Sequence, residues 1–425
     1  MTNKENLSDE EIRGLYRPRT VDSRIENALS VSGGVLITGP KWCGKTWTGT
    51  YHSKSSFGIY GMNERTIAMT SPEAALAGGR PHLVDEWQEA PVLWDAARNS
   101  IDRSTRPGMY IFTGSSVPPE GSMMHSGAGR FARVRMRTMS LFESGDSSGA
   151  VSLRSLFETG GTEPTGSSID YLKAVALICR GGWPGALQTG AASMPESYID
   201  TVAEHDVSHT DGKKRSPETA RAVIRSLARN VSTQANMSVV AADMSAEGRD
   251  VSVQTARDYV DALKRIYLVD EQEAWTPSLR SRVRVRTSPK RHLADPSLAA
   301  AALGAGPEML AKDVKTAGFL FESMCYRDMS VYAASLGGKV LHFRDETGGE
   351  VDQIIELPDG RWGAAEVKLG AFEADKAAKQ LLRLKGMAAE GSRDPSFLMV
   401  ITASGGMAYT RSDGVAVVPL DCLGP

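Results

Sequence analysis

A glycine-rich run of eight residues, directly behind a short apolar segment, is the feature that most restricts how this chain can fold. The apolar segment spans residues 34–38 and predicts a buried strand, and the residues after position 46 can begin a helix. The run fits the pattern G-x-x-x-x-G-K-[ST], in which backbone N–H groups surround phosphate oxygens. It consists of Gly39, Pro40, Lys41, Trp42, Cys43, Gly44, Lys45 and Thr46.

The residue types in this run predict a nucleoside triphosphate site. Glycines let the backbone amides turn toward phosphates, and a helix N-terminus adds a positive dipole. Lys45 is expected to reach the terminal phosphates, and the hydroxyl of Thr46 is expected to bind Mg²⁺. We assign residues 39–46 and the following Trp47 to the nucleotide-binding segment. A chance glycine turn is the alternative interpretation.

A second motif, at residues 81–86, reads as a strand that ends in two acids. This is the Walker B arrangement, in which Asp85 would hold Mg²⁺ and Glu86 would act as general base on the attacking water. A solvated strand end is the alternative for such a pair, but the upstream loop favours the functional interpretation. A third strand, at 109–113, leads into Gly114, Ser115 and Ser116, which form either a γ-phosphate sensor or a simple turn.

Bulk properties limit the class of protein. A length of 425 residues predicts two to four domains, and a net charge of -2 gives no global attraction to nucleic acid or membrane. The cysteines at 43, 179, 325 and 422 show neither disulfide nor metal-site spacing, which fits a reducing cytoplasm. No signal-peptide pattern opens the sequence, and no run of about 18 apolar residues predicts a membrane span.

Strands and helices alternate up to about Leu141, which predicts a parallel sheet wrapped by helices. Residues 143–168 are rich in Gly, Ser and Thr, and we expect a long loop or insertion there. Helical patterns cover 169–198, with a turn at 180–185. The His and Asp residues within 205–211 could ligate a metal, but a polar connection is the preferred interpretation.

Two amphipathic helices followed by two strands outline a winged helix. The first helix is expected at 219–230, and Ser252 is expected to cap the second. The strands are expected at 267–269 and 280–287. The second strand would place four arginines on one face, and residues 289–292 extend the basic run. Such a stripe can contact nucleic-acid phosphates, or it can be an ordinary solvated strand face. The arginines are Arg280, Arg282, Arg284 and Arg286.

A different chemistry follows residue 310. Strands expected at 339–344, 350–357 and 361–369 come after a helix at 316–332. A helix at 372–384 and a strand at 397–401 complete an αβββαβ core.

Acidic and basic residues on this core outline a metal-dependent phosphodiesterase site. Glu366 and Lys368 share one strand face, and Asp352 lies on the neighbouring strand. With Glu322 from the preceding helix, the carboxylates could hold one or two divalent ions while the lysine stabilises charge. The alternative is a salt-bridged hairpin in which Glu366 and Lys368 are merely paired.

Together, these motifs resemble the bacterial and archaeal AAA-type P-loop ATPases that carry a C-terminal domain of unknown function. In that family this domain has a restriction-endonuclease-like (PD-(D/E)XK) core. The similarity spans nearly the whole chain in the usual order, although Trp42 and Cys43 replace residues that are usually small polar or aliphatic. The matching positions are Tyr16 with Pro18 and Arg19, the glycine-rich loop, Asp85 and Glu86 with Gln88 and Pro91, 113–116, 128–130, 181–184, 288–290 with Asp295, 350–352 and 366–368.

The resemblance implies ATP binding and hydrolysis with Mg²⁺. It makes Ser115 the sensor and nominates Arg130, with Arg133 as second choice, as an arginine finger acting in cis or from a neighbouring subunit. In such proteins the nuclease-like core is often thought degenerate. The implied α/β multidomain order is a P-loop core at 1–168, a helical lid at 169–205, a winged-helix-like segment at 206–292 and a nuclease-like domain at 293–425.

Three hypotheses on function follow. The first is an AAA-type ATPase whose nucleotide state is coupled to the C-terminal nuclease-like domain. The second is an ATP-gated, metal-dependent nuclease with a second divalent metal. The third is an ATP-dependent switch that binds nucleic acid or protein without cleavage. Candidate partners are DNA or RNA at the winged-helix-like segment, another protein, or further copies of the chain, and no membrane is expected.

Overall fold

The structure is a computed structural model, and its residues form two compact units. The first unit contains Met1–Arg137, with Ser208–Lys214 and Arg265–Tyr267, and the second contains the remainder. Among the described residues, no helix combines the length and the apolar character that crossing a bilayer requires. The structure describes residues 7–104, 106–116, 125–190, 193–209, 213–276, 288–345, 348–388 and 394–425.

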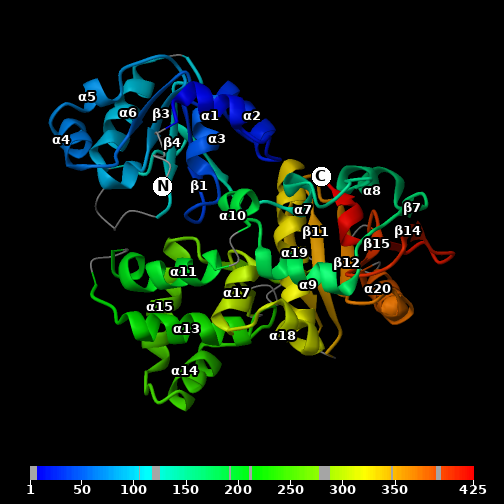
Figure 1. Cartoon of the computed structure of the whole chain (residues 1–425). Helices are drawn as coiled ribbons and strands as arrows, with labels where there is room; N and C mark the ends of the chain where they lie inside the picture. Colours follow the sequence, from blue (N-terminus) through cyan, green and yellow to red (C-terminus); the bar gives the residue numbers. More distant parts are fainter. Residues whose placement is uncertain are drawn as a thin grey trace. The chain divides into compact units, whose positions relative to one another are not determined.

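The first unit is built on a parallel sheet with the strand order β2-β3-β4-β1-β5. Helices cover both faces of this sheet (Figure 1), as the alternating sequence pattern predicts. The strands are β1 (Gly34–Thr38), β2 (Ser55–Gly58), β3 (His82–Asp85), β4 (Tyr110–Gly114) and β5 (Phe131–Arg135). The helices are α1 (Asp9–Leu15), α2 (Asp22–Val31), α3 (Lys45–His52), α4 (Met62–Thr70), α5 (Pro72–Ala75) and α6 (Val92–Asp102).

Alternating side chains of β1 fill two apolar cores. Leu36 packs into a cluster with residues of α4, α5 and α6, while Val35 and Ile37 pack into a second cluster with α2. A strand buried on both faces reads as a continuous apolar run, which is why its bounds were predictable. Because the strands are parallel, their carboxyl ends meet at one edge, and β4 lies between β1 and β3 there.

The second unit combines helices with a sheet of order β10-β11-β12-β13-β15-β14-β7. Its helices include α7 (Leu141–Ser144), α8 (Leu153–Thr159), α9 (Tyr171–Arg180), α10 (Pro184–Thr189), α11 (Met194–Thr201), α13 (Pro217–Arg229), α14 (Met237–Ala246), α15 (Val253–Arg265), α17 (Pro296–Ala302), α18 (Pro307–Lys312), α19 (Val314–Ser335) and α20 (Ala374–Ala388). Its strands include β6 (Val151–Ser152), β7 (Thr165–Gly166), β8 (Val269–Gln272), β9 (Lys290–Leu293), β10 (Lys339–Arg344), β11 (Glu350–Glu356), β12 (Trp362–Lys368), β13 (Leu398–Thr402), β14 (Met407–Thr410), β15 (Ala416–Pro419) and β16 (Leu423–Gly424).

The predicted αβββαβ order is confirmed as α19, β10, β11, β12, α20 and β13. Strands β10, β11 and β12 pair antiparallel, and β12 pairs parallel with β13. The apolar face of α20 packs on this sheet through Ala377, Leu381 and Leu384. Strands β14 to β16 were not predicted. The relation of this unit to nucleases stays a prediction.

Of the two alternatives predicted for residues 143–168, the long loop was wrong, and an insertion stays a prediction. This stretch contains α8, and its short strands β6 and β7 pair with β16 and β14 near the C-terminus. The carboxylate of Asp421 accepts hydrogen bonds from Ser167 Oγ at 2.6 Å and from the backbone of Ser168 at 2.9 Å. The N-terminal stretch of the first unit therefore ends at Arg137, whereas the boundary of the P-loop core was predicted at 168. The predicted lid, winged-helix-like and nuclease-like segments fall largely in the second unit, and its subdivision stays a prediction.

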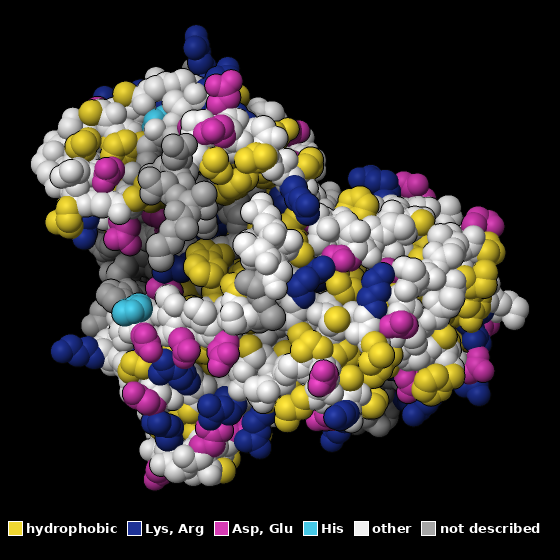
Figure 2. All heavy atoms as spheres, in the orientation of Figure 1, with side chains coloured by type: hydrophobic (Ala, Val, Ile, Leu, Met, Phe, Trp, Pro, Cys, Tyr) yellow, Lys and Arg dark blue, Asp and Glu magenta, His cyan; other side chains and the backbone are white. Residues whose placement is uncertain are grey.

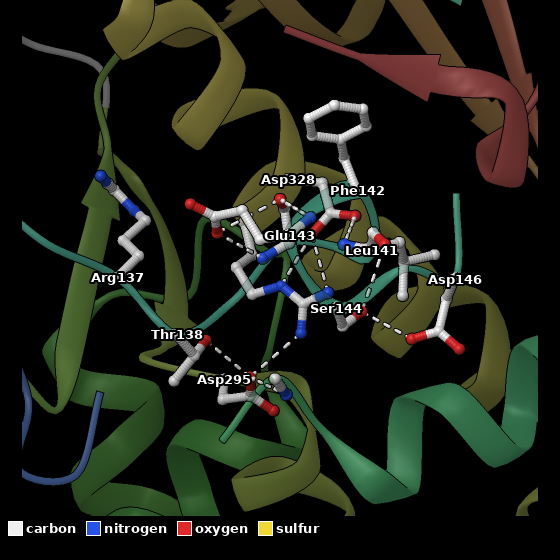
Figure 3. A network of polar contacts seen from close by, with 12 residues as sticks. Arg137, Thr138, Leu141, Phe142, Glu143, Ser144, Asp146, Asp295 and Asp328 are labelled. Atoms are coloured by element: carbon white, nitrogen blue, oxygen red, sulfur yellow. Dashed lines mark hydrogen bonds and ion pairs between the residues drawn. The ribbon is translucent and has the colours of Figure 1, made fainter. Parts of the chain in front are cut away.

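Within the second unit, a buried polar network connects the residues just before this segment with Asp295 and with α19 (Figure 3). Thr138 Oγ1 donates to Asp295 Oδ2 at 2.7 Å, and the backbone N–H of Leu141 donates to Asp328 Oδ2 at 3.0 Å. Arg327 bridges the two carboxylates at 3.1 Å and 2.7 Å. Fully buried charges persist when they are paired and hydrogen-bonded, so the network stabilises this arrangement.

In the described residues of the winged-helix-like segment, α13, α14 and α15 come before the antiparallel pair β8 and β9. Ser252 caps α15 as predicted, accepting from the backbone of Thr255 at 3.0 Å. The predicted strand at 267–269 was misplaced, because Tyr267 has a φ of 60° and β8 begins at Val269. The arginines at 280–286 lie outside the described residues, and the described second strand is β9.

The helical surface of this segment carries charges of both signs. Figure 2 shows Lys and Arg side chains intermixed with Asp and Glu over the helices at its lower left. Arg221 pairs with Asp200 at 2.8 Å and with Glu204 at 2.6 Å, and Arg225 pairs with Glu247 at 2.9 Å. These arginines are neutralised locally, so this helical face gives no support to the nucleic-acid prediction.

Candidate functional site

The loop between β1 and α3 has the backbone geometry of a phosphate-binding turn. Gly39 and Gly44 adopt φ values of 155° and 102°, in the region that favours glycine. A Cβ at Gly39 would lie 2.2 Å from the carbonyl oxygen of Met136, so no side chain fits there. The buried ammonium of Lys45 donates to the carbonyl oxygen of Pro40 at 2.7 Å, which holds the lysine across its own loop.

Asp85, at the carboxyl end of β3, connects this loop to the acidic motif. Its buried carboxylate accepts a hydrogen bond from Thr46 Oγ1 at 2.9 Å and one from Tyr60 OH at 2.7 Å. Thr113 Oγ1 donates to the other carboxylate oxygen. The structure therefore brings together the predicted Mg²⁺ ligands Thr46 and Asp85. An oxygen-rich pair of this kind fits Mg²⁺.

Glu86 lies beside this pair in a left-handed backbone conformation, with φ 52°. Its Oε2 accepts hydrogen bonds from Gln88 Nε2 and, at 3.4 Å, from Ser115 Oγ. Burial, and next the charge of Asp85, raise the pKa of Glu86 above the ordinary carboxyl value. A raised pKa suits a group that must take up a proton. The predicted base and the predicted sensor are thus in contact.

Residues of the N-terminal segment support the loop from outside. The guanidinium of Arg19 donates to the carbonyl oxygens of Cys43 and Arg137, each at 2.9 Å. Tyr16 OH lies 3.0 Å from Thr48 Oγ1 on α3 and donates to Asp22 at 2.7 Å.

Sequence reasoning missed the roles of Arg19 and Tyr60. The only available signal for Tyr60 was its position two residues after β2, whose last residue, Gly58, lies opposite Asp85.

Arg130 lies away from this site. It directly precedes β5, and its carbonyl oxygen accepts from the backbone of Gly34, the first residue of β1. It is therefore at the amino edge of the sheet, a strand length of roughly 16 Å from the carboxyl edge. Its guanidinium pairs with Asp102 at 2.8 Å. From this position Arg130 does not fit the role of an arginine finger for the site of its own chain. The predicted alternative, an arginine finger for the site of a neighbouring subunit, stays a prediction. Arg133 lies in β5 opposite Leu36, also short of the carboxyl edge.

In the second unit, the predicted residues Glu322, Asp352, Glu366 and Lys368 come together around a lysine that the prediction missed. Lys290 is 1% exposed. Its ammonium lies 2.8 Å from Glu322 Oε1, 2.8 Å from Glu350 Oε1 and 3.3 Å from Asp352 Oδ1. We call Lys290, Glu322, Glu350 and Asp352 the Lys290 cluster. The prediction that Lys290 extends an exposed basic run was therefore wrong.

The predicted pair on β12 lies beside the cluster. Lys368 Nζ is 2.7 Å from Glu366 Oε2 and 3.8 Å from Asp352 Oδ2. Burial, followed by the charge of Asp352, raises the pKa of both Glu322 and Glu366 to about 8. A cavity of about 560 Å³ opens onto Glu322, Asp352 and Lys368.

These residues do not fit the predicted second metal. A divalent ion shared by these acids needs carboxylate oxygens that are free to coordinate it, and Glu322, Asp352 and Glu366 each have one oxygen in contact with an ammonium group. Within the described part of the chain, no group of three or more His, Cys, Asp or Glu residues is arranged to hold a metal. We derive no chemical step from such an ion.

Two family models match the second unit, and both describe domains of unknown function. DUF8612 matches residues 172–309, and DUF4143 matches residues 317–423. The chain is 25% identical over 363 residues to the uncharacterized protein Rv2008c of Mycobacterium tuberculosis, covering 83% of this chain and 74% of that protein. Uncharacterized protein Mb2031c of Mycobacterium bovis matches with the same values.

Solved structures resemble the chain distantly. The Walker-type ATPase paby2304 of Pyrococcus abyssi aligns with a TM-score of 0.41 and 11% identity, over 71% of this chain and 99% of that one. The RuvB Holliday junction branch migration motor of Thermotoga maritima aligns with a TM-score of 0.27 and 14% identity, over 60% and 93% of the two chains. At these TM-scores the likeness assigns no function to this chain.

Proposed function

We propose that the first unit binds ATP with Mg²⁺ and hydrolyses it. The observation that carries this proposal is the 2.9 Å hydrogen bond between Thr46 and Asp85. It joins a loop with the backbone geometry for phosphate to an acid on a parallel strand at the same sheet edge. The proposal thus rests on the geometry of two motifs that are 39 residues apart in sequence.

Each residue of the site has a distinct role in this proposal. The loop amides and Lys45 bind the phosphates, and Lys45 exchanges the carbonyl of Pro40 for a phosphate oxygen. Thr46 and Asp85 would hold Mg²⁺, which neutralises phosphate charge when bound. Glu86 takes the proton of the attacking water, and Ser115 reports the γ-phosphate through its contact with Glu86.

Nucleotide binding and turnover test this proposal in the purified chain. Lys45→Ala is expected to abolish ATP binding. Glu86→Gln is expected to retain binding while turnover falls by about 100-fold, the effect typical of losing a general base. Glu89→Gln, an exposed acid three residues further on, is the matched control and should retain both. Folded protein that neither binds nor hydrolyses any nucleoside triphosphate with Mg²⁺ would contradict the proposal.

We further propose that nucleotide state controls the binding of nucleic acid or protein by the second unit, and that this unit does not cleave nucleic acid. The Lys290 cluster favours this hypothesis over an ATP-gated nuclease, because its carboxylates already contact a cation. Incubation with DNA or RNA and Mg²⁺ or Mn²⁺, with and without ATP, should leave the nucleic acid intact. Cleavage that disappears in Asp352→Ala would establish the nuclease hypothesis instead.

A further inference from the structure

The Lys290 cluster gathers opposite charges from three separate elements. Lys290 comes from β9, Glu322 from α19, and Glu350 and Asp352 from β11. The ammonium lies within 3.3 Å of an oxygen of each of the three acids. Glu322 and Asp352 are mostly buried, whereas the Glu350 side chain is 37% exposed. Carboxyl groups this close repel one another when ionised, and a buried lysine is costly when unpaired. The ammonium of Lys290 therefore reduces the repulsion among the carboxyl groups, and the carboxyl groups provide the buried ammonium with partners.

Both carboxylate oxygens of Asp352 already have partners. Oδ1 contacts the ammonium of Lys290, and Oδ2 accepts the backbone N–H of Val367 at 3.0 Å. A Mg²⁺ or Mn²⁺ ion shared by Glu322 Oε1, Glu350 Oε1 and Asp352 Oδ1 would need these oxygens at about 2.1 Å, in the space where the ammonium lies. The ammonium and a divalent ion therefore compete for one position.

A divalent ion is not excluded from these acids by lack of space. Glu322 and Asp352 line a cavity of about 560 Å³, which is far larger than a hydrated ion requires. A divalent ion could enter this cavity and meet the acids. What opposes its binding is the positive charge already held among the oxygens.

We propose that Lys290 is a tethered cation, which occupies the position of a divalent metal in the carboxyl cluster of the second unit. The cluster as it stands is then closed to Mg²⁺ and Mn²⁺ for electrostatic reasons. Removing the ammonium converts the same acids into a divalent-cation site. This inference concerns the second unit alone and does not rest on ATP hydrolysis by the first.

Manganese binding to the full chain tests the inference. Asp85→Asn is introduced first, so that the nucleotide site does not contribute, and bound Mn²⁺ is then counted by electron paramagnetic resonance. The Asp85→Asn parent should show no stoichiometric site. Lys290→Met in this background should gain one Mn²⁺ per chain, with affinity at least about tenfold above the parent. Adding Asp352→Asn should remove the new site.

Two further variants separate the charge of Lys290 from its bulk and from general effects. Lys290→Arg keeps a positive charge and should bind no Mn²⁺. Lys315→Met removes an exposed lysine that lines the same cavity but lies outside the cluster, and it should not gain a site either. Folded Lys290→Met protein without a Mn²⁺ site would overturn the inference.

The parent protein gives a second test that does not depend on the folding of Lys290→Met. Stoichiometric Mn²⁺ binding by the Asp85→Asn parent, lost on adding Asp352→Asn, would show that the ammonium does not take the place of a metal. If neither the Asp85→Asn parent nor the protein that also carries Asp352→Asn binds Mn²⁺, the result supports the inference.

Discussion

Arg19→Met should loosen the loop at residues 39–46, for which we propose phosphate binding, without removing a residue that we assign to nucleotide contact. Arg19 is 7% exposed, and its guanidinium donates to the carbonyl oxygens of Cys43, inside the loop, and of Arg137, just after β5. Methionine keeps much of the side-chain volume but donates no hydrogen bond. The variant therefore removes the connection between the loop and the edge of the sheet.

The magnitude follows from the two lost contacts. Hydrogen bonds that involve a charged group contribute about 1.5 to 3 kcal/mol each, so two bonds at the lower value contribute about 3 kcal/mol. Each 1.4 kcal/mol corresponds to about tenfold in an equilibrium constant. If the whole loss falls on the binding-competent loop, ATP affinity should fall by about 100-fold, and a partial loss should still exceed about fivefold.

Calorimetry of ATP binding measures the affinity, and hydrogen exchange of residues 39–46 measures the stability of the loop. Arg17→Met is the matched control, because Arg17 is exposed and lies two residues away. It should change neither quantity. Arg19→Met protein with ATP affinity within twofold of wild type, and with unchanged exchange in the loop, would refute the idea that Arg19 stabilises the loop.

Three other variants test the assignments of charge and contact. Gln88→Ala removes a hydrogen bond that lowers the pKa of Glu86, so the acid limb of the ATPase pH profile should move to higher pH. Glu322→Gln should flatten the pH dependence of urea unfolding. The folded-state pKa of Glu322 is raised from 4.5 to about 8, so its contribution is full below pH 4.5 and is lost as pH rises toward 8. Asp421→Ala removes acceptors for Ser167 and Ser168 and should lower the unfolding free energy of the second unit by about 1 to 3 kcal/mol, measured by urea titration.

The geometry of the proposed nucleotide site was predictable because its signals are local. The apolar run of β1 and the glycine-rich turn are contiguous in sequence, and the predicted strand Gly34–Thr38 matches the structure residue for residue. The sequence also held a signal about Arg130 that our prediction did not use. A residue that immediately precedes a parallel strand lies at the amino edge of the sheet, opposite the phosphate loop.

The Lys290 cluster was not predictable in the same way. Lys290 stands between Pro289 and Arg291, in a stretch whose composition is that of an exposed basic run. Its partners lie 32, 60 and 62 residues further on, and only the packing of β9 against α19 and β11 brings them together. The segment at 143–168 failed for the same reason, because its strands pair with segments more than 200 residues away.

The two carboxylate sites of this chain meet the need for positive charge in opposite ways. Within the described residues, Asp85 receives hydrogen bonds from the neutral hydroxyls of Thr46, Tyr60 and Thr113, and no Lys, Arg or His forms a salt bridge with it. Such dipoles leave a buried carboxylate able to gain further from an external cation, whereas the Lys290 cluster contains its own.

Divalent ions should therefore stabilise the two units unequally. Mn²⁺ or Mg²⁺ without nucleotide should raise the unfolding temperature of the first unit, because an ion that binds the folded state alone shifts the equilibrium toward it. Asp85→Asn should remove this effect, and Asp352→Asn should leave it unchanged. Scanning calorimetry of the full chain distinguishes these outcomes. A divalent-dependent stabilisation that is lost in Asp352→Asn and retained in Asp85→Asn would reverse the assignment of the two sites.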